Sequence, residues 1–210
     1  MRSTTLTEPL EVLDRIVAKA RNEFGIEAKI SLVLGATGGG VKHGHFFPNS
    51  WTTSDGETVH EIVLSGESLE RGAVPTLGTL LHELAHAYNH ENEVKDVSDG
   101  GRYHNKEFRN TAERMGLSIE KADRIGFSVT TVPAETVFKW GAEINELERS
   151  LKTWRRSVTE LAAEKKTSKK YTMVCYSCND PVVTTKGWFE RNDPRCGIHD
   201  EAMHLEIEGA

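Results

Sequence analysis

The chain has 210 residues, which is enough for one hydrophobic core of moderate size and a small additional module. Hydrophobic residues make up 37% of it and charged residues 28%, the composition of a soluble globular protein, and no segment approaches the roughly 18 consecutive apolar residues of a membrane span. The net charge of −6 excludes a global attraction to nucleic acid and leaves only a local basic face.

The N-terminal segment predicts a cytoplasmic protein that begins with a helix. Residues 1–5 lack the apolar stretch of a secretory signal. Residues 8–24 then place apolar side chains at every third or fourth position, which is typical of an amphipathic helix. Gly25 follows where such a helix is expected to stop.

The next segments predict a small antiparallel sheet. Residues 30–34 are typical of a buried strand, and the glycine-rich run 35–44 is interpreted as a flexible turn. Residues 45–52 and 58–65 flank Asp55-Gly56, a dipeptide that favours a hairpin.

Residues 75–89 predict the helix that carries the chemistry. Its apolar stripe is wide and consists of Leu77, Leu80, Leu81, Leu84, Ala85 and Tyr88. His82-Glu83-Leu84-Ala85-His86 lies within this helix and has the H-E-x-x-H pattern of zinc peptidases. Residues 91–101 are polar and are interpreted as a loop, and a further helix is predicted to start near Asn105.

The spacing of this motif has a direct chemical meaning. Residues i and i+4 lie on one helix face, so His82 and His86 can bind one metal ion at about 2 Å from each nitrogen. Glu83 is offset by one position, so it is predicted to act as the general base on a metal-activated water rather than as a ligand. The alternative is an ordinary exposed helix face, but both histidines border an apolar stripe that must pack.

A catalytic zinc needs a third protein ligand, and His104 is the predicted one. It follows the polar loop, which is long enough to return the next helix to the metal. Glu107 and Glu113 remain alternatives. His90 is disfavoured because it lies about 12 Å beyond His82 along the helix.

Residues 135–163 predict one long amphipathic helix. Apolar residues alternate by three and four positions at Val137, Trp140, Ile144, Leu147, Leu151, Trp154, Val158 and Leu161. One interpretation is a helix that lies across the catalytic domain, and the other is a coiled coil that forms a homodimer. Gly141 weakens both interpretations slightly.

The tail predicts a zinc ribbon that binds one structural zinc ion. Its ligands are two pairs at metal-site spacing, separated by residues 179–195: Cys175 with Cys178, and Cys196 with His199. Residues 171–174 and 182–185 are interpreted as short flanking strands. His204 is a rival fourth ligand, and unrelated free thiols are the alternative to a metal site.

The catalytic motif, followed by a histidine and then Phe108, resembles the SprT-like metallopeptidase domain, and the tail strengthens the likeness. In that family the third histidine usually stands before a glycine, whereas here Asn105 follows His104. The family is similar to the Spartan proteases, so the resemblance implies proteolysis of DNA-crosslinked proteins, that is, a role in DNA–protein crosslink repair. Tyr88, Tyr103 and Arg102 are candidates for stabilising the oxyanion, by proximity alone.

DNA is an expected partner beside the protein substrate. A basic strip precedes the ribbon, in which Trp188 and Phe189 are candidates for stacking on bases. The strip consists of Lys152, Arg155, Arg156, Lys165, Lys166, Lys169 and Lys170. A solvated helix face and linker is the alternative interpretation of this strip.

Together these patterns predict an α+β protein without a membrane segment and with two zinc ions, one catalytic and one structural. Residues 1–132 are expected to form a zincin-like catalytic domain, residues 133–166 the long helix and residues 167–210 the ribbon. The predicted activity is that of a zinc endopeptidase. The alternative function is a nucleic-acid-binding or assembly protein whose zincin-like domain is not catalytic.

Overall fold

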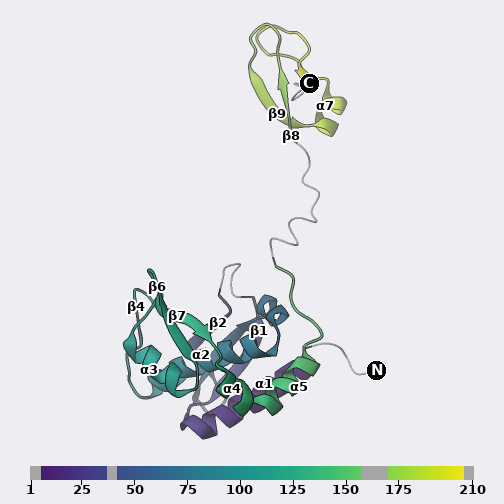
Figure 1. The fold of residues 1–210 in the computed structure, drawn as a ribbon. Helices are drawn as coiled ribbons and strands as arrows, with labels where there is room; N and C mark the ends of the chain where they lie inside the picture. The colour runs from purple at the N-terminus through teal and green to yellow at the C-terminus, as the bar shows by residue number, and fades with distance from the viewer. Residues whose placement is uncertain (1–5, 37–41, 158–169, 206–210) are drawn as a thin grey trace. The chain divides into compact units, whose positions relative to one another are not determined.

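The computed structural model describes residues 6–36, 42–157 and 170–205, and it is a mixed α+β structure with small sheets (Figure 1). The chain divides into two compact units, Met1–Val158 and Thr159–Ala210. The boundaries predicted at residues 132 and 166 stay predictions. Within the described residues, no helix combines the length and apolar character that crossing a membrane requires.

The first helix, α1 (Thr7–Phe24), forms as predicted and packs its apolar stripe into the core. The stripe consists of Val12, Leu13, Ile16, Val17 and Ala20, all of them buried. The helix ends at Gly25, whose φ of 72° is left-handed and whose N–H donates to the carbonyl of Arg21 at 2.9 Å.

The first sheet is mixed, which corrects the prediction of an antiparallel one. It contains β1 (Ile30–Gly35), β2 (Gly44–Thr52) and β3 (Thr58–Ser65) in the order β1-β3-β2. The hairpin of β2 and β3 forms as predicted, but β3 returns between the other two strands and pairs with β1 in parallel. The connection from β1 to β2 is long enough to leave room for this central strand, whereas the tight turn after β2 forces antiparallel pairing.

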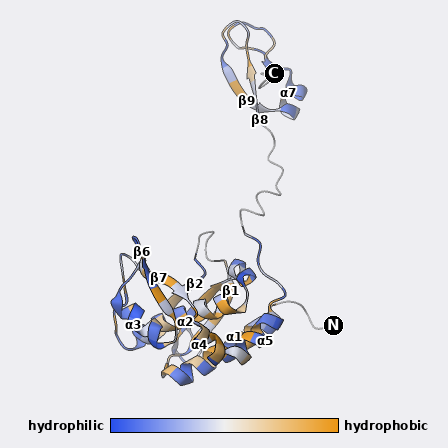
Figure 2. Ribbon diagram, viewed as in Figure 1, coloured by the Kyte–Doolittle hydropathy of each residue, from blue (hydrophilic) through white to orange (hydrophobic). Residues whose placement is uncertain are grey.

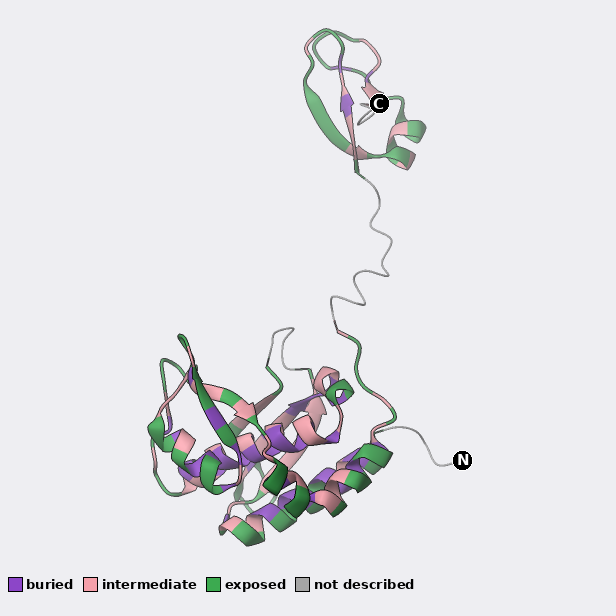
Figure 3. Ribbon diagram, in the orientation of Figure 1, coloured by how far each residue is buried: buried purple, intermediate pink, exposed green. Residues whose placement is uncertain are grey.

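The central helix of the first unit is α2 (Ala73–Glu91), which follows a short 3-10 turn, η1 (Gly66–Arg71). Its predicted apolar stripe is buried in the core, apart from the half-buried Tyr88, and packs against α1 and the first sheet (Figures 2 and 3). At Gly78 an added Cβ would lie 2.8 Å from a methyl carbon of Val132. At this point the helix therefore packs closely against the chain near Val132.

A second sheet lies on the other side of the catalytic motif. It contains β4 (Val97–Ser98), β5 (Tyr103–His104), β6 (Ser118–Ala122) and β7 (Gly126–Thr131) in the order β4-β5-β7-β6. Helix α3 (Lys106–Arg114) starts where the sequence predicts a helix.

Asn105 is the N-cap of α3. Its side-chain oxygen accepts from the backbone N–H groups of Glu107 and Phe108. The asparagine that replaces the glycine of the SprT-like pattern thus has a structural role as a cap.

The prediction of one helix over residues 135–163 is wrong. The chain forms α4 (Ala134–Lys139) and α5 (Gly141–Ser150), which meet at Trp140, and residues 151–157 are not helical. Residues 158–163 lie outside the described residues. Trp140 and Leu147 are fully buried in the core of the first unit, so the stripe of α4 and α5 packs against α1 and α2, and over residues 134–157 it is not one continuous helical seam.

Over its described residues, 170–205, the second unit is a small antiparallel sheet with one short helix. It contains β8 (Lys170–Val174), β9 (Pro181–Thr185), α7 (Lys186–Asn192) and β10 (His204–Leu205), in the strand order β10-β8-β9. The two predicted strands of the tail are confirmed as β8 and β9. The buried core of this unit consists of Met173, Cys175, Cys196 and Met203.

Candidate metal centres

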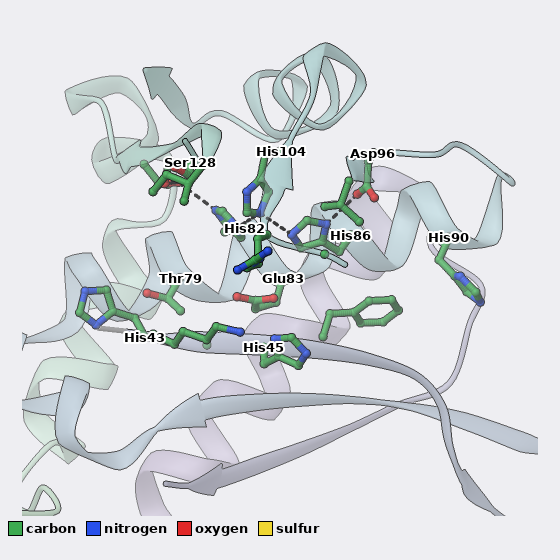
Figure 4. A pocket seen from close by; sticks show the side chains of 18 of the residues that line it. His43, His45, Thr79, His82, Glu83, His86, His90, Asp96, His104 and Ser128 are labelled. Carbon is green, nitrogen blue, oxygen red and sulfur yellow. Dashed lines mark hydrogen bonds and ion pairs between the residues drawn. The ribbon is translucent and has the colours of Figure 1, made fainter. Parts of the chain in front are cut away.

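The three histidines that the sequence singled out come together in one place. His82 and His86 lie on α2 and His104 lies on β5, and their rings converge beside Glu83 (Figure 4). The Nε2 atom of His104 is 3.3 Å from that of His82 and 3.1 Å from that of His86. All three ligand atoms lie within 4.8 Å of one another.

These three imidazoles fit a tetrahedral zinc ion. Zinc–nitrogen bonds of about 2.0–2.1 Å place neighbouring ligand nitrogens roughly 3.3 Å apart, close to the observed separations. Burial and the neighbouring His86 hold the pKa of His82 well below its usual value and lower that of His104 to about 4. These rings are therefore neutral near pH 7, and their nitrogen lone pairs face one another as they would around a cation.

Two of the rings have partners on their outer nitrogen. His82 Nδ1 lies 2.9 Å from the hydroxyl of Thr130, and His86 Nδ1 lies 2.6 Å from the carboxylate of Asp96. A partner on Nδ1 leaves Nε2 free as a ligand and fixes the plane of the ring. The ring of Phe108 packs against all three imidazoles, with centroid distances of 4.4, 4.6 and 4.5 Å.

Glu83 is a buried carboxylate beside these ligands. Burial raises its pKa to about 7, with a smaller contribution from Asp96. Strand β2 passes so close that a Cβ at Gly44 would lie 2.8 Å from Glu83 Oε1. A carboxylate with a pKa near neutrality can both accept and return a proton, which is what a general base and acid must do.

The histidines and Glu83 line a cleft of about 880 Å³. One wall comes from β2, including Gly44 and Phe46, and the other comes from the segment between α2 and β5 and from β7. A volume of this size accommodates a segment of peptide or a small molecule.

None of the alternative ligands for the first site belongs to the histidine group, although His90 lines the same cleft. The ring of His90 contacts those of Phe46 and His60. Glu107 and Glu113 are exposed at α3 and are not part of the histidine group, and Glu113 pairs with Arg109.

Among the oxyanion candidates, only Arg102 lines the cleft, where it pairs with Asp99. Tyr88 lies under the guanidinium of Arg114 and lines no part of the cleft, and neither does Tyr103.

A second group of ligand atoms lies in the C-terminal unit. Cys175, Cys178, Cys196 and His199 bring their ligand atoms within 4.8 Å of one another. The sulfurs of Cys178 and Cys196 are 3.8 Å apart, and His199 Nδ1 lies 3.5 and 3.6 Å from the sulfurs of Cys175 and Cys196. Zinc–sulfur bonds of about 2.3 Å give edges of roughly 3.8 Å, so this group also fits zinc.

The surroundings of these cysteines differ from one to the next. Backbone N–H groups of His199 and Ile198 lower the pKa of Cys196 to about 6, whereas burial and a hydrogen bond to Glu201 raise that of Cys175 to about 12. His204, the rival ligand, stacks on Tyr176 with a centroid distance of 4.2 Å and is not part of the group.

The sequence-based reasoning missed the residues that support the first site. Asp96, Thr130 and Gly44 come from three different segments, and no local pattern connects them with the motif. Asn89 and Thr111 are polar residues within the two helices predicted around the motif, and only the structure shows that both are buried.

Comparison with known proteins gives one match. The model of the SprT-like family matches residues 6–131, which is more than half of the 210 residues and includes all three histidines and Glu83. No curated protein and no solved structure is significantly similar to the chain.

Proposed function

This chain belongs to the SprT-like family, and we propose that it is a zinc-dependent endopeptidase with a zincin-like catalytic domain. One observation carries the proposal: three imidazole nitrogens converge beside a buried carboxylate in a single cleft. A purely structural zinc site has no use for a carboxylate that lies beside the ligands and is not one of them.

In the proposed mechanism, His82, His86 and His104 hold the zinc ion through their Nε2 atoms. When bound, zinc supplies Lewis-acid chemistry, which lowers the pKa of water toward about 7 and polarises a peptide carbonyl. Glu83 takes the proton of the attacking water on a carboxylate oxygen and passes it to the nitrogen of the leaving amine. Thr130 and Asp96 keep two of the histidines oriented while this proton moves.

The cleft also supports an extended peptide as the substrate. Strand β2 lies at the edge of its sheet and pairs only with β3 among the described strands, so its outer backbone groups are available to a peptide. Gly44, His45 and Phe46 of this strand line the cleft next to Glu83. A peptide paired with β2 would therefore pass the reacting groups.

We propose that the Cys175, Cys178, Cys196 and His199 group binds a structural zinc ion in a zinc ribbon. Four protein ligands fill a tetrahedral site and leave no position for a substrate. The ligand separations and the small surrounding core support this assignment.

DNA-bound proteins are the substrates that we propose, with the ribbon as a docking module for DNA. Similarity to the Spartan proteases motivates this proposal, and exposed aromatic side chains support it, because Tyr176 is 73% and Trp188 is 43% exposed. Phe189 instead packs against the small core. Arg155 of the basic strip pairs with Glu67, and Lys165, Lys166 and Lys169 lie outside the described residues.

The deciding experiment compares the wild type with Glu83→Gln on an unstructured protein substrate, with and without single-stranded DNA. We expect the variant to keep its zinc and to lose cleavage by about 10²- to 10⁴-fold, because the amide cannot accept the proton. Glu107→Gln is the matched control, since that carboxylate is exposed outside the cleft and its loss should leave cleavage unchanged.

Equal cleavage by the wild type and Glu83→Gln would contradict the mechanism. A chain that binds zinc and DNA but cleaves nothing would favour the nucleic-acid-binding alternative. Faster cleavage in the presence of DNA would distinguish a DNA-directed protease from a general one.

A further inference from the structure

A chain of buried hydrogen bonds leads from His86 away from the cleft and into α3. His86 Nδ1 lies 2.6 Å from Asp96 Oδ2, and the same oxygen accepts from Asn89 Nδ2 at 3.0 Å. The oxygen of the Asn89 amide in turn accepts from the hydroxyl of Thr111 at 2.6 Å. Four side chains from α2, the following loop and α3 are thus connected in series.

The chain is shielded from water, which makes its geometry specific. Asn89 is fully buried, and Thr111 and Asp96 are each 8% exposed. Buried polar groups are costly unless their hydrogen bonds are satisfied, so each member constrains its neighbours. The fully buried ring of Phe108 packs against His86, the histidine at the end of this chain.

The donors and acceptors can be assigned in only one consistent direction. The Thr111 hydroxyl donates to the amide oxygen of Asn89, so the amide NH₂ faces Asp96. The Asp96 carboxylate accepts from that NH₂, and it accepts equally from Nδ1–H of His86. His86 is thereby held in the tautomer whose Nε2 lone pair points toward His82 and His104.

Further hydrogen bonds tie the loop that carries Asp96 to the residue after His104. The backbone N–H of Asn105 donates to the carbonyl of Asp96 at 2.9 Å, and Asn105 Nδ2 donates to the carbonyl of Lys95 at 2.7 Å. Asn105 directly follows His104 in the chain. The position of the loop that carries Asp96 is therefore tied to the position of His104.

From these contacts we propose that Asn89 and Thr111 are positioning residues for the metal site. They orient Asp96, which fixes the ring and the tautomer of His86 even though neither residue touches the cleft. This inference rests on the proposed function, because it assumes that His82, His86 and His104 bind zinc. It goes further than that function, because it makes the orientation of the His86 ring depend on the buried hydroxyl of Thr111 on α3.

The test compares Thr111→Val, Thr111→Ser and Thr76→Val in the full-length protein. Valine has nearly the shape of threonine without the hydroxyl, and serine retains the hydroxyl. Thr76 is the matched control: it is also buried, and its hydroxyl donates to the carbonyl of Gly72 at 2.8 Å, but it lies outside the chain to His86. Both valine variants should lower the melting temperature by similar amounts.

Zinc affinity distinguishes positioning from a structural role. Competition with a chromophoric chelator should show that Thr111→Val weakens the histidine site by about 3- to 10-fold, while Thr111→Ser and Thr76→Val leave it unchanged. Asp96→Asn, which acts directly on His86, should weaken the site by about 10- to 100-fold. Substitution of zinc by cobalt provides an internal control. The thiolate-to-cobalt absorption band reports on the cysteine site and should stay constant in all variants.

Wild-type zinc affinity in a folded Thr111→Val would overturn the proposal, whatever the effect of Asp96→Asn. If Thr111→Val fails to fold, Thr111→Ala removes the same hydroxyl and decides instead: weaker zinc binding supports the proposal and wild-type affinity refutes it. Failure of the proposed function has a different signature. In that case the wild type binds no zinc at the histidines, or it binds zinc and Glu83→Gln cleaves as well as the wild type.

Discussion

The two candidate metal centres differ in what surrounds them. The histidine site is built on a helix whose apolar stripe lies in a large core, to which α1, the first sheet and α5 all contribute. The cysteine site lies in a unit whose buried core has four members, two of which, Cys175 and Cys196, are themselves candidate ligands.

This difference indicates that the stability of the two units depends on metal to different degrees. In the first unit the core holds the three histidines in place, so on the proposed function a zinc ion there would serve chemistry and not structure. In the second unit few apolar side chains are buried, and a core of that size cannot stabilise a fold by itself. There the proposed structural zinc would supply the stability that the core lacks.

Metal removal should therefore separate the two units, and this is the largest effect that we expect. Zinc binding contributes roughly 10–16 kcal/mol in small structural sites, so chelation should unfold residues 170–205. Amide hydrogen exchange should show loss of protection in β8 and β9, while α1 and α2 of the first unit remain protected. Cleavage should stop in the same sample.

Restoring zinc provides the control for this experiment, because protection and cleavage should both return. Cys178→Ser should reproduce the loss of protection in the second unit without a chelator. Unchanged exchange in β8 and β9 after complete zinc removal would refute the structural role of the metal.

A substitution in the large core should destabilise the first unit and leave the second unit unchanged. Phe108→Ala removes a fully buried ring that contacts all three histidines, and we expect a loss of about 3–5 kcal/mol in the unfolding free energy of the first unit. The second unit should be unaffected. Denaturant unfolding followed by exchange of each unit measures both quantities.

Phe138→Ala is the control, because that side chain is 90% exposed and its loss should change stability by less than about 0.5 kcal/mol. If the two substitutions destabilise the first unit equally, the large core is not what holds the histidine site together.

Local patterns predicted the parts of the structure that depend on local physics. The apolar period located α1, α2 and α3, and the i, i+4 spacing of His82 and His86 brought them to one helix face as expected. Within each pair of candidate zinc ligands in the tail, a short turn likewise brings the two side chains together. His104 was predicted on the expectation that the polar loop returns the chain to His82 and His86, and its ring does lie beside theirs.

The remaining features depend on contacts between distant segments. Strand β3 lies between β1 and β2 and pairs with β1 in parallel, an order that the apolar pattern of each strand does not specify. The apolar period does not reveal the break at Trp140, because the stripe continues through it and α4 and α5 bury that stripe in the same core. Asp96 and Thr130 support the histidines from segments that no short motif includes.

The smallest effect that we predict concerns the asparagine that replaces the family glycine. Asn105→Ala removes the side chain that caps α3 and donates to the carbonyl of Lys95, and we expect a loss of about 1 kcal/mol in the unfolding free energy of the first unit. Asn105→Gly should cost less, because glycine is itself an acceptable N-cap.

Both Asn105 variants should nevertheless weaken zinc binding by a similar factor, since each frees the loop at Lys95 beside Asp96. Urea unfolding and chelator competition on the same samples measure the two effects separately. If Asn105→Gly matches the wild type in zinc affinity as well as in stability, Asn105 acts only as a cap. The histidine site would then depend on the core and on the chain from Thr111, and not on the bond from Asn105 to the loop.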